Sequence, residues 1–128
     1  MTTATLFGLA LAPLYSAIAQ VESDRGATSA NVYQIREIYV RDVNRIISHD
    51  RIASMPFDLT DNRSKDRSEI MMHIYWRHWG IHYQQKTGKP VTYEVLARIH
   101  NGGPLGWKNP ETLAYWQKVK AIMEGGAK

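Results

Sequence analysis

The chain has 128 residues, of which 44% are hydrophobic and 22% charged, so its size and apolar content suit one compact domain with one core. It contains no cysteine, which excludes disulfides, a thiolate zinc site, an iron–sulfur cluster and a cysteine nucleophile. The 16 Lys and Arg against 12 Asp and Glu give a net charge of +4. This charge favours a polyanionic partner such as nucleic acid, anionic lipid or a cell-wall polymer, without choosing among them.

The first twenty residues are largely apolar and permit two interpretations. Ala17 and Ala19, on either side of Ile18, imitate the small-x-small pattern of a signal-peptidase site, but no Lys or Arg precedes Arg25, so the basic region that begins a signal peptide is missing. The alternative is a buried first helix with Pro13 in its first turn and one apolar face. Polar residues interrupt this segment before it reaches the roughly 18 to 20 apolar residues of a membrane span, so we expect no stable membrane insertion.

Apolar residues spaced three and four apart predict a second helix over residues 34–47. Residues 48–64 show little periodicity and predict a long loop with at most one short turn. Asp66 and Glu69 have the spacing of a capping box, which predicts the start of a third helix that Gly88 can end.

The last third of the chain predicts two more helices. Thr92 can cap a short helix, and the glycine-rich residues 101–106 break the chain after it. Residues 109–111 supply the cap, the first-turn proline and the acidic residue that start the final helix. Extended structure is expected only at residues 31–34 or 89–91. The sequence therefore predicts a mainly α fold, a single domain over residues 1–128 with about five helices and little or no β-structure.

Glu22 is the first residue that could carry chemistry. It is a lone carboxylate at the end of an apolar helix face, and burial of a carboxyl group favours the protonated form that a general acid needs. A solvated glutamate near a helix end is the alternative. Three segments follow one another along the chain, namely residues 20–23 (QVES), residues 33–36 (YQIR) and residues 97–104 (ARIHNGGP).

In this order the three segments resemble those of the lysozyme superfamily, in particular the invertebrate-type lysozymes, their bacterial and phage relatives, and the lytic transglycosylases. The resemblance extends from Leu14 to residues 112–116, and residues 99–104 are its most specific part. It implies a lysozyme-like fold and gives Glu22 the role of catalytic acid. It also implies substrate-binding residues along a saccharide cleft, which are Tyr33, Gln34, His100, Asn101 and Tyr115.

Two features depart from the invertebrate-type pattern. Those lysozymes are rich in cysteine, whereas this chain has none. Their second carboxylate lies just before the tyrosine–glutamine–isoleucine motif, but the corresponding residues 25–32 of this chain contain no Asp or Glu. Asp24, the nearest in sequence, and Glu37, one helical turn beyond the motif, are the candidate second catalytic residues, although each also fits an exposed position. Lytic transglycosylases, which this layout also resembles, use a single Glu together with the substrate's own acetamido group and 6-hydroxyl. Hydrolysis and anhydro-sugar formation therefore both stay open.

Two further groups of residues could bind a ligand. His78 and His82 lie four apart on one helix face, as two ligands of a zinc-binding helix would, but no third ligand is marked. We therefore expect no metal and no cofactor. Among the tryptophans, Trp107 is the candidate that stacks on a sugar face.

Together these features predict a monomeric glycosidase, a lysozyme or a lytic transglycosylase. It would bind peptidoglycan glycan strands and cleave the β-1,4 bond between N-acetylmuramic acid and N-acetylglucosamine, with no nucleic-acid partner. It would act on the cell wall, whether secreted, periplasmic or phage-associated. Two alternatives remain: a lysozyme-like module that has lost catalysis and binds glycan or protein, and a basic nucleic-acid-binding domain that uses the helix over residues 34–47.

Overall fold

The computed structural model describes residues 4–125, which form five α-helices, three short 3-10 helices and one two-stranded hairpin. Of the expected domain, residues 1–3 and 126–128 lie outside the described part. The elements in chain order are β1 (Thr5–Leu6), β2 (Leu9–Ala10), α1 (Ala12–Asp24), α2 (Glu37–His49), η1 (Leu59–Arg63), α3 (Lys65–Thr87), α4 (Tyr93–Gly102), η2 (Gly106–Lys108), η3 (Pro110–Thr112) and α5 (Leu113–Met123). This architecture confirms the mainly α prediction.

Local capping chemistry sets most helix ends. Pro13 stands in the first turn of α1, and the Thr92 side chain accepts a hydrogen bond from a backbone N–H in the first turn of α4, both as predicted. Gly88 ends α3 in the left-handed region, with a φ of 71°. The predicted capping box at Asp66 is wrong, because the cap of α3 is Ser64, whose hydroxyl accepts from the Arg67 N–H.

The extended structure lies at the start of the chain, so its predicted positions at residues 31–34 and 89–91 are wrong. β1 pairs with β2 in antiparallel register, with Thr5 opposite Ala10. Phe7 and Gly8 form the turn, and both have positive φ, as tight two-residue hairpins require. The Phe7 ring packs against Gly80 of α3, where an added Cβ would lie 2.5 Å from the ring. A glycine at this point of α3 lets the hairpin pack closely.

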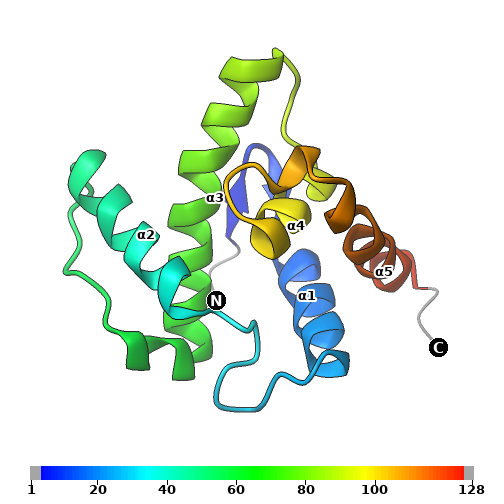
Figure 1. Cartoon of the computed structure of the whole chain (residues 1–128), viewed down its shortest axis with the longest axis horizontal. Coiled ribbons are helices and arrows are strands. Elements are labelled where there is room, and N and C mark those ends of the chain that lie inside the picture. Colours follow the sequence, from blue (N-terminus) through cyan, green and yellow to red (C-terminus); the bar gives the residue numbers. More distant parts are fainter. Residues whose placement is uncertain (1–3, 126–128) are drawn as a thin grey trace.

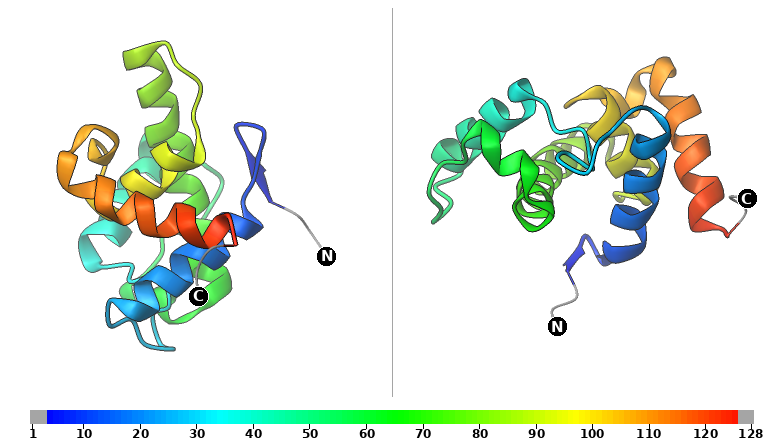
Figure 2. Two further views of the ribbon diagram at one scale, coloured as in Figure 1. Left: turned by 90° about the vertical axis from the view of Figure 1, so that its right-hand side faces the viewer. Right: turned by 90° about the horizontal axis from the view of Figure 1, so that it is seen from below.

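The helices pack on both sides of α3, which runs through the centre of the molecule (Figure 1). α2 lies along one side of α3, and α1 and α5 lie side by side on the other (Figure 2). α4 packs between α3 and α5. The largest side chains of the core are fully buried; they include Trp76, Tyr33, Leu14, Ile18, Met71 and Leu96. No helix within residues 4–125 has both the length and the apolar character that crossing a bilayer requires.

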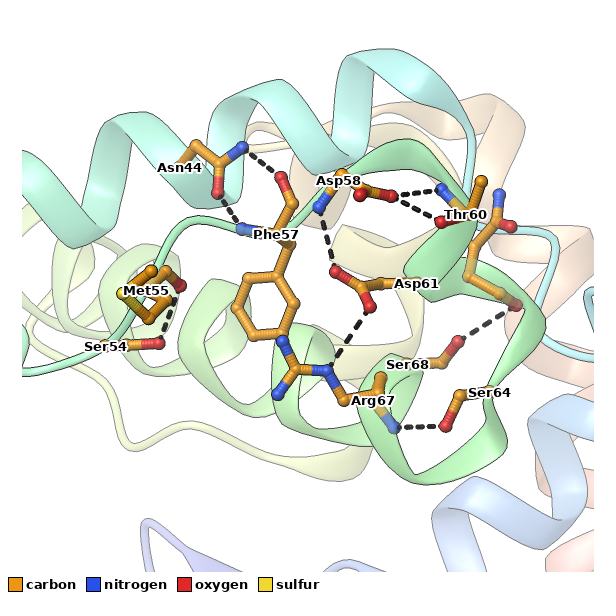
Figure 3. A network of polar contacts seen from close by, with 11 residues as sticks. Asn44, Ser54, Met55, Phe57, Asp58, Thr60, Asp61, Ser64, Arg67 and Ser68 are labelled. Carbon is orange, nitrogen blue, oxygen red and sulfur yellow. Dashed lines mark hydrogen bonds and ion pairs between the residues drawn. The ribbon is translucent and has the colours of Figure 1, made fainter.

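The segment between α2 and α3 contains the one short turn that the sequence predicts, η1, and is fixed by side chains of both helices (Figure 3). The Asn44 side chain donates to the Phe57 carbonyl and accepts from the Phe57 N–H, each over 2.8 Å. The Arg67 guanidinium lies 4.4 Å from the centre of the Phe57 ring and donates to Asp61. These contacts anchor the loop to α2 and α3, which together form one wall of the site.

Candidate active site

Glu22 is buried near the end of α1, on the face of the helix that packs against α4 and α5. Only 5% of the residue is exposed. Its Oε2 accepts a hydrogen bond of 2.7 Å from the hydroxyl of Tyr115 in α5. Burial raises the pKa of Tyr115, and the nearby charge of Glu22 raises it further, so Tyr115 stays protonated and acts as the donor.

His100 of α4 lies beside Glu22 and is also buried. Its Nε2 is 2.9 Å from the Tyr33 carbonyl oxygen, and its Nδ1 is 3.3 Å from the Tyr39 hydroxyl. Burial lowers the pKa of His100, against the opposing effect of the Glu22 charge. A carbonyl can only accept, so in the neutral ring Nε2 carries the proton and Nδ1 accepts from Tyr39. The separation of 4.0 Å between His100 Nε2 and Glu22 Oε2 is thus a close contact without a hydrogen bond.

A cleft of about 750 Å³ opens in front of these two residues. It runs between the end of α1 with α4 and the wall formed by α2 and α3. The residues that line it are Glu22, Arg25, Gln34, Arg36, Ile38, Tyr39, Asp42, Arg45, Tyr75, Trp79, His100, Asn101, Gly102, Gly103 and Pro104. Three arginines and two carboxylates give the cleft a mixed but net basic character. Such a surface suits a ligand that carries negative charge as well as hydroxyl groups.

Gln34 fixes the loop that leads from α1 into the cleft. Its backbone has a φ of 52°, and its side-chain amide donates to the carbonyls of Glu22 and Arg25 over 3.4 and 3.1 Å. This conformation keeps Gln34 out of α2, which begins at Glu37 and not at the predicted residue 34. Gln34, His100 and Asn101 all line the cleft, as does Glu22.

Three of the predicted substrate-binding residues are not among those that line the cleft. Tyr33 is fully buried, and its hydroxyl donates to Glu69 over 2.5 Å, so it serves the site through its carbonyl bond to His100. Tyr115 lies behind Glu22. Trp107 packs edge-on against Tyr83 and lines a separate hollow of about 270 Å³. The tryptophan in the cleft is Trp79 instead.

The two candidate second carboxylates also lie outside the cleft lining. Asp24 is exposed at the end of α1, and Glu37 is exposed and forms an ion pair with Arg41 one turn along α2. The structure brings a different carboxylate, Asp42, into the cleft, where the residue is 7% exposed. Asp42 accepts hydrogen bonds from Trp79 Nε1 at 2.9 Å and from Arg45 at 2.5 Å.

Sequence reasoning missed Asp42 because it stands between Arg41 and Val43 in an amphipathic helix, where charged residues usually face solvent. One signal could have found it. Asp42 is three residues after Tyr39 and four before Ile46, so it shares a face with two apolar residues. Both of these residues are buried.

Comparison with known proteins finds that the chain is similar to lysozymes. Over 100 residues the chain is 28% identical to invertebrate-type lysozyme 6 of Caenorhabditis elegans, a match that covers 77% of this chain and 70% of that one. A lysozyme of Magallana gigas is 54% identical over 37 residues, only 29% of this chain and 27% of that protein. No family model matches the chain.

A solved structure shares the fold. It is described as Aeromonas hydrophila PliI in complex with Meretrix lusoria lysozyme, and one of its chains matches with a TM-score of 0.63 and 26% identity. The match covers 87% of this chain and 88% of that one. The protein therefore resembles invertebrate-type lysozymes in sequence and a chain of a lysozyme complex in fold, which confirms the resemblance carried by its motifs.

Proposed function

We propose that this protein is a peptidoglycan glycosidase that cleaves the β-1,4 bond between N-acetylmuramic acid and N-acetylglucosamine, with Glu22 as general acid and base. The observation that carries the proposal is the buried carboxyl of Glu22, which lines the cleft and is oriented by the Tyr115 hydroxyl. The similarity to lysozymes supports the same substrate class.

In this mechanism Glu22 protonates the glycosidic oxygen as the bond to the leaving sugar breaks, and a positive oxocarbenium-like state develops on the other sugar. The resulting Glu22 carboxylate stabilises that state and then removes a proton from the incoming nucleophile. Tyr115 supports this cycle by donating to the carboxylate. The fixed N–H of His100 holds the loop at Tyr33 behind the acid.

The nucleophile decides between two reactions. With water the product is a reducing sugar, and with the substrate's own 6-hydroxyl it is an anhydro sugar. Asp42 is the second carboxylate among the residues that line the cleft, and both of its oxygens already accept hydrogen bonds, from Trp79 and Arg45. We assign Asp42 to electrostatic support of the oxocarbenium-like state, since a carboxylate engaged in this way is a poor covalent nucleophile.

Three arginines give the cleft its preference for an acidic glycan. Arg25, Arg36 and Arg45 lie along it, and carboxylate groups of the glycan or of its peptide substituents are natural partners for guanidinium groups. The interaction is electrostatic and partly exposed, so binding to purified peptidoglycan should weaken as salt is added.

The test is mass spectrometry of the soluble fragments that the protein releases from purified peptidoglycan. Glu22→Gln should keep its far-ultraviolet circular dichroism and lose at least ~100-fold of the release rate, because general acid catalysis contributes that much. Asp24→Asn and Glu37→Gln are matched controls: both residues lie outside the cleft lining, and we expect both variants to retain activity.

Each outcome has a distinct meaning. Reducing ends indicate hydrolysis, and anhydro ends indicate transglycosylation from Glu22. Full activity in a folded Glu22→Gln variant overturns the proposed mechanism. A folded wild-type protein that binds peptidoglycan but releases no fragments favours the alternative of a lysozyme-like binding module, which is suggested by the absence of Asp and Glu from residues 25–32.

A further inference from the structure

Three side chains outside the cleft lining bring two imidazoles and one carboxylate together where α2 ends against α3. His49 is the last residue of α2, Asp50 follows it, and His78 belongs to α3. His49 Nδ1 lies 2.7 Å from Asp50 Oδ1, and His78 Nδ1 lies 2.7 Å from Asp50 Oδ2. One possible ligand atom from each residue lies within 4.8 Å of the other two.

We propose that His49, Asp50 and His78 form a binding site for one Zn²⁺ ion. Zinc binds imidazole nitrogen and carboxylate oxygen, and three protein ligands with water as the fourth are a common set. Calcium and magnesium prefer oxygen ligands alone. Tetrahedral zinc bonds of about 2.0 to 2.1 Å hold donors roughly 3.3 to 3.4 Å apart. The two contacts of 2.7 Å, which involve different oxygens of Asp50, need to open by ~0.6 Å, and ligand atoms that are up to 4.8 Å apart need to approach by at most ~1.5 Å.

Two of the three proposed zinc ligands are held in place by the fold, and the third is exposed to solvent. The side chains of Asp50 and His78 are only 21% and 22% exposed. The backbone N–H of Asp50 donates to the Ile46 carbonyl over 2.8 Å, and the His78 ring packs edge-on against Trp79. His49 is 77% exposed and can turn toward the ion. Two ligands are thus held in place while the third closes the site from the solvent side.

This site differs from the pair that the sequence suggested, and it departs from the expectation of no metal. His78 and His82 lie along the same helix, but His78 turns to Asp50 while His82 packs edge-on against Trp79. An ion bound by His78 would therefore join α2 to α3. The inference goes beyond the proposed glycosidase activity and does not depend on it.

The experiment titrates Zn²⁺ into the full-length, chelator-treated protein by isothermal titration calorimetry. We expect one ion per chain and a melting temperature that rises with zinc concentration, because a site formed by the fold binds the ion more tightly than the unfolded chain does. His49→Ala, Asp50→Asn and His78→Gln should each weaken the affinity at least ~10-fold. His82→Gln and His73→Gln are matched controls on α3 and should bind zinc like the wild type.

His49 is exposed, so His49→Ala is not expected to disturb folding, and unchanged circular dichroism verifies this for every variant. The proposal is overturned if the wild type shows neither binding heat nor a shift in melting temperature at millimolar zinc. It is also overturned if His49→Ala binds as tightly as the wild type, or if His82→Gln removes binding, which would indicate a different ligand set. None of these measurements uses lytic activity, so the zinc site and the glycosidase function can fail separately.

Discussion

The hydrogen bond from Tyr115 to Glu22 permits a quantitative test of how the buried carboxylate is held. Tyr115→Phe removes the hydroxyl that donates to Glu22 over 2.7 Å and leaves the aromatic ring in place. A hydrogen bond to a charged group contributes about 1.5 to 3 kcal/mol, so we expect the variant to lose that much free energy of unfolding. For a domain of this size the loss corresponds to a fall in Tm of roughly 4 to 12 °C.

Urea unfolding at neutral pH measures the effect, first in the wild type and then in the Glu22→Gln background. The amide oxygen introduced by Glu22→Gln still accepts from Tyr115 but carries no charge, so Tyr115→Phe should cost only about 0.5 to 1.5 kcal/mol there. Tyr83→Phe is the matched control, because Tyr83 is also nearly buried and lines the separate hollow beside Trp107. The predicted loss is refuted if the free energy of unfolding of Tyr115→Phe lies within ~0.5 kcal/mol of the wild-type value with an unchanged m value, because the Tyr115 hydroxyl would then not stabilise the Glu22 carboxylate.

Three further predictions concern the residues around the site. Burial lowers the pKa of His100 from its ordinary 6.5, so the stability that His100 contributes is complete above pH 6.5 and is lost as the pH falls below it. Between about pH 7 and pH 5, the free energy of unfolding measured with urea should therefore decline less steeply in His100→Gln than in the wild type. Equal slopes would contradict a lowered pKa of His100. Gly106→Ala should lose about 1 to 3 kcal/mol in thermal unfolding, because the added Cβ meets the backbone carbonyl of Arg98, and a wild-type Tm would show that this contact is not tight. Asn44→Ala removes both hydrogen bonds to the Phe57 backbone and should speed limited proteolysis of the loop between α2 and α3, whereas an unchanged cleavage rate would mean that Asn44 does not anchor it.

Local signals in the sequence predict most of the helical framework. Pro13, Thr92 and Gly88 act through the backbone of their own neighbours, so their effect can be read without knowledge of the fold. The same holds for the apolar spacing of each helix. The hairpin at the start of the chain was missed because its turn, Phe7 and Gly8, lies within an apolar run that also reads as a helix.

The details of the cleft depend on contacts between distant segments, which the sequence does not display. Gln34 adopts a positive φ while its side chain bonds to carbonyls at the end of α1. Asp42 is buried because Trp79 of another helix donates to it. Tyr33 belongs to one of the motifs, yet it contacts His100 through its backbone carbonyl, while its hydroxyl donates to Glu69. Sequence motifs thus indicate which residues lie near the cleft, whereas tertiary packing determines which of their atoms contact it.

The bond between Tyr115 and Glu22 joins residues that are 93 positions apart. During synthesis at about 5 to 20 residues per second, roughly 5 to 19 s separate the addition of the acid from the addition of its hydroxyl donor. A nascent chain that carries Glu22 thus lacks the final helix that completes its environment. For the proposed glycosidase, we expect a nascent chain to which Tyr115 has not yet been added to cleave no glycan, so that cleavage begins only after α5 has been synthesised.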